Sequence, residues 1–215
     1  KAFQLPIIAG LVVLGAWCAE IHASGYELSR GRQVLLNRGL QLQALVWPHS
    51  PPFDLYPGVA EPSRWIESNF TTMNFFAGPT PYTTRLLAKL PAGSQWGRSN
   101  HNYGNTLTSE DEPYSDGFVG FCYEDEVVQT PAVQDEEKAL FAYWKSQYPN
   151  ALAYTNFWGT QLNASELGAY MRYTEPDMLM FDTYPGFAFP RAKRNEWYSS
   201  MQLYRVAGLG GIDGT

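Results

Sequence analysis

The segment Gly117–Glu126, GFVGFCYEDE, constrains the fold of this 215-residue chain more than any other stretch. Its apolar and aromatic run ends abruptly in three consecutive acids. A second run, Asp177–Pro185 (DMLMFDTYP), ends in a similar way at Asp182 and Tyr184. Continuous apolar runs of this length are typical of strands that are buried on both faces of a parallel sheet. The sequence therefore predicts an α/β fold with polar side chains at the exits of its strands.

Strand and helix patterns alternate along the chain, without a hairpin signal between strands. We predict strands at 40–47, 70–76, 94–98, 117–126, 151–158 and 177–184, and helices at 29–38, 83–90, 131–148, 165–173 and 196–209. This order predicts parallel strands joined by helical crossovers. A complete (β/α)8 barrel of the TIM type has about 250 residues. We therefore predict a TIM-type barrel that is truncated after about six β/α units, with an open six-stranded sheet as the alternative.

The first residues differ from the rest of the chain. Lys1 is followed by a mostly apolar run over 5–17, and small or aliphatic residues occupy 21–23. This pattern is typical of a secretory signal peptide, here cleaved after Ala23, and the run is short for a membrane span. We expect residues 24–215 to form one incomplete barrel domain, secreted or periplasmic and without stable membrane insertion. If residues 1–23 are retained, we expect them to anchor the protein to the cell envelope.

Composition narrows the function classes. The net charge of −6, without a basic stripe, argues against a nucleic-acid partner. The aromatic share of 15% fits either a large core or a cleft for stacking on sugars. The three His and two Cys have no metal-ligand spacing, so we predict no metal and no cofactor. Cys122 is expected to be a small buried hydrophobe.

The acids at the strand exits favour glycoside hydrolysis, which needs a proton donor and a second carboxylate. Burial and a neighbouring acid raise a carboxyl pKa, as a proton donor requires. We predict Glu126 as this donor and Asp125 as its orienter, with Glu124 on the same strand face as Glu126. Asp182 is expected to bind a sugar hydroxyl or to tune the donor. The structural alternatives are solvated loop acids and, for Asp182, a bond to a neighbouring strand's backbone.

Other polar and aromatic residues fall near predicted strand ends and are candidates for holding a carbohydrate substrate. Asparagine also favours turns, and each tryptophan could equally belong to the core. The long polar segment 99–116 is either a functional loop or a surface excursion. The candidate substrate-binding residues are Trp47, Asn74, Trp96, Glu124, Asn156, Trp158 and Tyr184.

Four segments together resemble secreted bacterial glycoside-hydrolase-like proteins with a TIM-barrel domain. They are RGRQVLLNRGLQLQALVWP (30–48), NFTTMNF (69–75), YEDE (123–126) and PDMLMFDTYP (176–185). In related retaining glycosidases the acid/base is a Glu that closes strand four, which matches Glu126. Those enzymes have Asn where this chain has Asp125. Their nucleophile is a Glu that closes strand seven, and it has no counterpart here.

The pair Asp125-Glu126 also resembles hexosaminidases that use substrate assistance. There the Asp orients the acetamido group of the sugar, and the following Glu donates the proton. This mechanism needs no carboxylate from strand seven. The sequence therefore predicts a glycoside hydrolase of poly- or oligosaccharides. The alternatives are substrate-assisted hydrolysis through Asp125 and Glu126, and a carbohydrate-binding barrel without catalysis.

Overall fold

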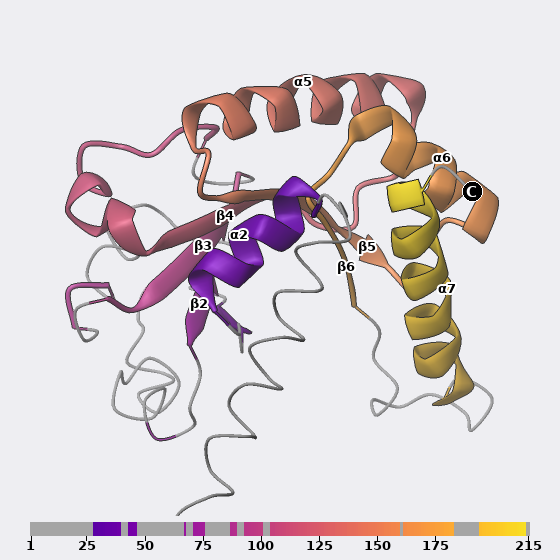
Figure 1. Ribbon diagram of the computed structural model, residues 1–215, viewed down its shortest axis with the longest axis horizontal. Helices are drawn as coiled ribbons and strands as arrows, with labels where there is room; N and C mark the ends of the chain where they lie inside the picture. The colour runs from indigo at the N-terminus through magenta and orange to yellow at the C-terminus, as the bar shows by residue number, and fades with distance from the viewer. Residues whose placement is uncertain are drawn as a thin grey trace, which may run out of the picture.

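A computed structural model describes the chain at residues 28–39, 43–46, 67, 71–75, 87–89, 93–100, 104–159, 161–182 and 194–213. These residues form an α/β fold around one curled, parallel, six-stranded sheet, a half-barrel in the order β1-β2-β3-β4-β5-β6 (Figure 1). The strands are β1 Gln43–Val46, β2 Thr72–Phe75, β3 Gln95–Ser99, β4 Phe118–Tyr123, β5 Leu152–Trp158 and β6 Met178–Asp182. The predicted parallel sheet in sequential order is confirmed.

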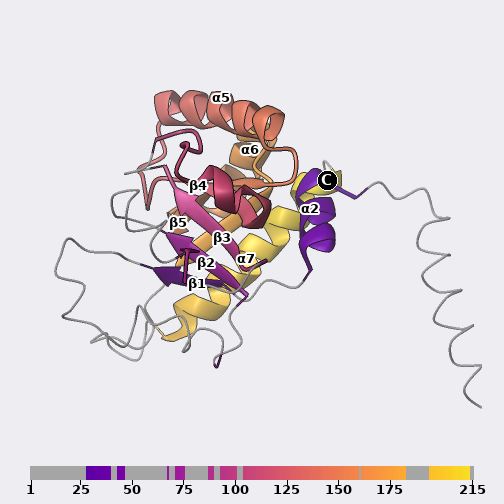
Figure 2. The ribbon, with the colours of Figure 1, turned by 90° about the vertical axis from the view of Figure 1, so that its left-hand side faces the viewer.

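Helices cover the outer side of this sheet and its amino edge. Helices α5, α6 and α7 lie along the outer side, whereas α2 lies across the end where the strands begin (Figure 2). The sequence supplies the helix starts through side-chain caps at Ser29, Thr130 and Asn163. The helices are α2 Arg30–Arg38, α5 Pro131–Gln147, α6 Ala164–Thr174 and α7 Arg194–Asp213, with a short 3-10 helix, η2, at Glu112–Gly117.

Two expectations about the helices are wrong. The helical spacing of the apolar residues in 131–148 predicts that Tyr143 faces inward, but it is 40% exposed, and Phe141 is buried instead. The inward face of α5 is formed by Glu137, Phe141 and Trp144, which are spaced four and three residues apart. The last helix does not end at Gly210, because it continues to Asp213. The predicted helix 83–90 lies mostly outside the described residues.

The core has two layers, one on each side of the sheet. The outer layer packs aromatic side chains of the strands against α5, α6 and α7, and the rings of Phe121 and Trp144 are stacked with centroids 4.8 Å apart. The inner layer contains Cys122 and Tyr154, with Val34 of α2 packed against them. All six residues of β4 are buried, as the apolar run predicted. Cys122 is buried and reduced, as expected.

A buried ion pair orders the segment between β3 and β4. Arg98 donates to Asp111 at 2.8 Å, and both side chains are fully buried. Asp111 also accepts from the backbone N–H and the hydroxyl of Thr108. Removing one partner of such a pair leaves an uncompensated charge in the core, which strongly destabilises the fold. The segment predicted as a long polar loop is therefore partly built into the core.

Two arginines of α2 attach this helix to the amino edge of the sheet. Arg30 pairs with Asp177 and donates to the carbonyls of residues 148, 149 and 151. Arg38 donates to the carbonyls of residues 116, 118 and 150. These bonds satisfy carbonyls where the β4 and β5 strands begin. Among the described residues, no helix is long and apolar enough to cross a membrane.

Gly31 allows the close approach of α2 to β6. A Cβ atom at this position would overlap the backbone carbonyl oxygen of Asp177. We expect Gly31→Ala to lower the free energy of unfolding by about 1–3 kcal/mol, the usual cost of overpacking. Urea denaturation measures this change.

Gly168→Ala in α6 is the matched control. Its added Cβ would meet only the flexible guanidinium of Arg172, at 3.4 Å. Alanine should therefore stabilise this helix by up to about 1 kcal/mol. Equal effects of the two substitutions would contradict the docking of α2 through Gly31.

Candidate functional site

The three acids after β4 form a loop and not the end of the strand. β4 ends at Tyr123, so the predicted alternation that put Glu124 and Glu126 on one strand face does not apply. Both residues adopt left-handed backbone conformations, with φ of 39° at Glu124 and 51° at Glu126. Such angles are uncommon for residues other than glycine and cost about 1–3 kcal/mol. We call residues 124–130 the acid loop.

Two asparagines at neighbouring strand ends hold the acid loop. Asn100, after β3, accepts the backbone N–H of Glu124 at 2.8 Å. Asn156, on β5, accepts the N–H of Glu126 through its carbonyl at 3.1 Å. The side-chain amide of Asn156 also donates to the carboxylate of Asp125 at 2.8 Å. The loop is therefore fixed from both sides, with the side chain of Asp125 oriented by Asn156.

Glu126 and Asp182 form a close carboxyl pair at the carboxyl ends of β4 and β6. The pKa of Glu126 is raised to about 8, chiefly by burial, then by its hydrogen bond with Asp182 and by the charges of Asp182 and Asp125. The buried Oε1 of Glu126 has no hydrogen-bond partner among the described residues. Burial and nearby negative charge both disfavour the ionised form of Glu126. Glu126 therefore holds a proton near neutral pH.

The fold brings together the three residues predicted as catalytic. Asp182 is the last residue of β6 and is paired in register with Trp158 of β5. Asn156 lies two residues before Trp158, so both side chains lie on the same face of the strand. Trp158 is 41% exposed, as a stacking platform requires. Glu124 is half-buried in the acid loop.

The other candidate binding residues lie elsewhere. Trp96 is fully buried, and its indole N–H donates to the carbonyl of Tyr114 at 2.8 Å. It lies near the start of β3 in the outer core, where no ligand can stack on it, so its expected position at a strand exit is wrong. Asn74 is buried and donates to the hydroxyl of Tyr154 at 2.6 Å. Trp47 and Tyr184 lie outside the described residues.

Sequence reasoning placed Asn100 in a polar loop but gave it no role. It missed Glu137, which lies behind the acid loop, and Gln129, which belongs to the loop and contacts Glu137. The spacing of Glu137 to Phe141 and Trp144 on one helix face could have identified it as a buried acid. The left-handed residues carry no sequence signal, because glycine or asparagine is the usual choice there.

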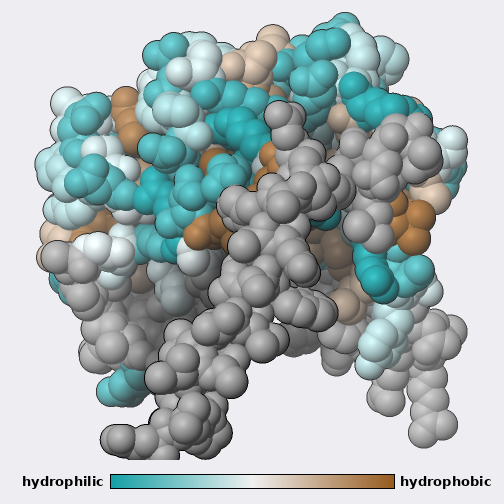
Figure 3. Space-filling model, viewed as in Figure 1, coloured by the Kyte–Doolittle hydropathy of each residue, from teal (hydrophilic) through white to brown (hydrophobic). Residues whose placement is uncertain are grey.

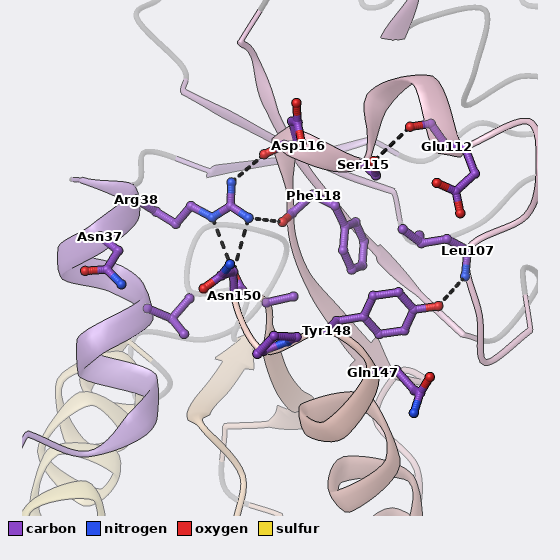
Figure 4. A pocket seen from close by; sticks show the side chains of 13 residues that line it. Asn37, Arg38, Leu107, Glu112, Ser115, Asp116, Phe118, Gln147, Tyr148 and Asn150 are labelled. Atoms are coloured by element: carbon purple, nitrogen blue, oxygen red, sulfur yellow. Dashed lines mark hydrogen bonds between the residues drawn. The ribbon is translucent and has the colours of Figure 1, made fainter.

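Two described cavities, of about 650 and 900 Å³, lie at the amino edge of the sheet, opposite the acids. Figure 4 shows the first of them, where the guanidinium of Arg38 points at backbone carbonyls and links α2 to the sheet. In the view of Figure 3 the described surface is mostly hydrophilic, with small separate apolar patches. Among the described residues, no group of three or more His, Cys, Asp or Glu side chains could hold a metal ion. We therefore consider the acid edge, and not either cavity, as the candidate site.

Comparison of the chain with protein-family models, curated proteins and solved structures gave no match. The site is therefore interpreted from its own geometry.

The left-handed backbone of Glu124 can be tested by substitution. Glycine adopts this conformation without the Cβ penalty of about 1–2 kcal/mol, whereas alanine does not. We expect Glu124→Gly to be about 1 kcal/mol more stable than Glu124→Ala in urea denaturation. Both variants lose the same carboxylate, so their difference isolates the backbone. An alanine variant as stable as the glycine variant would contradict the left-handed assignment.

The raised pKa of Glu126 predicts a dependence of stability on pH. The pKa of Glu126 is 4.5 in the unfolded chain and about 8 in the folded protein. Between these two pH values the folded protein keeps a proton on Glu126 that the unfolded chain has released. Stability contributed by this proton is therefore lost as pH rises through that range. We expect Glu126→Gln to reduce the fall of the urea midpoint between pH 5 and pH 8.5. Glu110→Gln, at an exposed acid, should leave the fall unchanged.

Proposed function

We propose that this protein is a glycoside hydrolase of poly- or oligosaccharides, with Glu126 as its proton donor. The observation that carries the proposal is the half-buried carboxyl pair Glu126–Asp182 at the carboxyl edge of a parallel sheet. Glycosidic bond cleavage needs an acid that is still protonated near neutral pH and then gives its proton to the leaving oxygen. A carboxyl with a pKa of about 8 meets this need.

We propose further that the half-barrel is part of a TIM-type (β/α)8 barrel. The strand order, the parallel pairing and the outer helices are compatible with that architecture. In such barrels the active site lies at the carboxyl ends of the strands, which is the edge that holds the acid loop. The resemblance to secreted glycoside-hydrolase-like proteins supports the same assignment, including an extracellular or periplasmic location.

Asp182 fits a role in tuning the donor better than a role as nucleophile. The two catalytic carboxyl groups are about 5–5.5 Å apart in retaining enzymes and about 6.5–9.5 Å apart in inverting ones. A carboxyl in hydrogen-bond contact with Glu126 is closer than either spacing. Its negative charge instead keeps the proton on Glu126 until the leaving oxygen accepts it.

Substrate-assisted hydrolysis is the second candidate, and the position of Asp125 favours it. Asn156 fixes the Asp125 carboxylate beside the proton donor. An oriented carboxylate there could accept the N–H of a substrate acetamido group, whose carbonyl oxygen then attacks the anomeric carbon. The covalent bond to the leaving oxygen breaks as Glu126 donates its proton. This route would require an N-acetylated sugar.

The proposal predicts distinct effects of two substitutions on hydrolysis of a glycan panel. Glu126→Gln removes the proton donor, so we expect kcat/KM to fall by at least about 100-fold. Asp182→Asn removes the charge that holds the proton, so the pKa of Glu126 should fall. The alkaline limb of the pH–rate profile should then move to lower pH. Initial rates between pH 4.5 and 9 measure both effects.

Glu110→Gln serves as the control and should leave the profile unchanged. Undiminished hydrolysis by Glu126→Gln would show that Glu126 is not the proton donor. An alkaline limb that does not move in Asp182→Asn would show that Asp182 does not tune the pKa of Glu126. Cleavage confined to N-acetylated substrates would favour the substrate-assisted route. Glycan binding without cleavage would favour a non-catalytic carbohydrate-binding protein.

A further inference from the structure

A fully buried acid, Glu137, lies behind the acid loop, on the other side of the sheet. Glu137 belongs to the second turn of α5 and is fully buried between that helix and the outer side of the sheet. A buried carboxyl is costly, and leucine or methionine would fill the same helix face without that cost. The position therefore needs a reason beyond packing.

Glu137 is connected to the acid loop through one glutamine. The Oε1 atom of Glu137 accepts from the side-chain amide of Gln129 at 3.2 Å. The same amide nitrogen lies 3.4 Å from the carbonyl oxygen of Val127, the residue after Glu126. The side chain of Gln161 donates to this carbonyl as well, at 2.5 Å. The loop is thus held directly after the proton donor.

The same carboxyl faces the end of β5. The hydroxyls of Thr155 and Tyr170 lie near Glu137 and favour its ionised form. Thr155 also donates to the carbonyl of Tyr123, the last residue of β4 before the acids. Asn156, the next residue on β5, points to the opposite side and holds Asp125. Adjacent residues of one strand therefore contact the acid loop from the inner side and Glu137 from the outer side.

We propose that Glu137 is a positioning residue for the acid loop, which it fixes through Gln129 from the outer side of the sheet. The catalytic role of the acid loop rests on the proposed function, whereas the contact of Glu137 with the loop does not. Gln129 connects the two parts, because its side-chain amide contacts both the Glu137 carboxylate and the backbone carbonyl of Val127 in the acid loop. When Glu137 is lost, this amide loses its buried acceptor and the loop after Glu126 loses one of its two side-chain anchors.

The electrostatic surroundings of Glu137 agree with this role. Burial raises its pKa to about 7, while the bond from Gln129 and the nearby hydroxyls of Tyr170 and Thr155 act in the opposite direction. The charge of Glu136, on the same helix, adds to the rise, and the facing titratable groups are Tyr123 of β4 and Tyr170 of α6. None of these groups is a cation, so the hydrogen bond from the Gln129 amide is the polar contact that stabilises the carboxyl.

Amide hydrogen exchange tests the proposal without a substrate. In Glu137→Leu we expect the amide of Glu126, which donates to the carbonyl of Asn156, to exchange at least tenfold faster. The amide of Asp177, at the opposite edge of the sheet, should change by less than threefold. Glu137→Gln keeps an acceptor oxygen for Gln129 and should restore the exchange rate of Glu126.

Two further variants keep the test decisive. Gln129→Met removes the connecting amide and leaves α5 unchanged, so it should raise the exchange of Glu126 even if Glu137→Leu does not fold. Asp135→Leu, at an exposed acid of the same helix, is the matched control and should leave that rate unchanged. Equal acceleration at Glu126 and Asp177, or none in either variant, would overturn the proposal.

Activity forms a separate arm of the experiment. If the wild-type chain hydrolyses a glycan, Gln129→Met should lower kcat about tenfold with KM unchanged, because the donor is misplaced while the binding surface remains. An unchanged kcat would overturn the positioning role. If no glycan is hydrolysed, the proposed function fails, and the exchange rates still decide whether Glu137 holds the loop.

Discussion

The pairing of β4 with β5 is the interaction on which the candidate site depends. Its register sets Cys122 opposite Tyr154 and Tyr123 opposite Thr155. Asn156 therefore lies level with the first residue beyond β4, where its carbonyl and its side chain reach the acid loop. A slip of one residue would turn Asn156 to the outer side and Thr155 to the inner side. The bonds to the loop would then be lost together.

The site is maintained against several local costs. Glu124 and Glu126 occupy left-handed backbone conformations, and Glu126 lies against another carboxyl group. Each of these features lowers stability, and each would be relieved by a simple substitution. Strain of this kind persists only where the surroundings determine the conformation, here through Asn100 and Asn156. The role proposed for Glu126, a preorganised proton donor, is of the kind that commonly lowers the stability of a protein.

The fold was more predictable from the sequence than the site. The apolar runs and their alternation with helical patterns predicted the parallel strand order, because burial leaves a periodic signal in the sequence. They also placed Asp182 and the acids after β4 at one edge. The prediction that Glu124 and Glu126 share one strand face failed because β4 ends one residue earlier, at Tyr123. Side chains alternate between the two faces of a sheet only within a strand. Trp96 was misplaced because a tryptophan in a core and one in a cleft look alike in sequence.

The distribution of charge separates the two edges of the sheet. At the amino edge, Arg30 is paired with Asp177, and α2 covers the strand starts. At the carboxyl edge the acids face one another. The amino termini of α5 and α6 follow β4 and β5, so their partial positive charges lie toward this edge. Such a helix terminus stabilises a nearby negative charge by about 0.3–1 kcal/mol, which lowers the pKa of a carboxyl by less than one unit.

That contribution is too small to offset the rise of the Glu126 pKa from 4.5 to about 8. Burial and the Asp182 carboxyl therefore outweigh the helix termini, and the proton stays on Glu126. An amide at 182 would remove the repulsion but leave the burial of Glu126, which is the largest cause of the rise. The pKa of Glu126 would therefore fall only part of the way toward 4.5. The Asp182 charge thus sets how far above its ordinary value the donor titrates, while burial keeps it above that value.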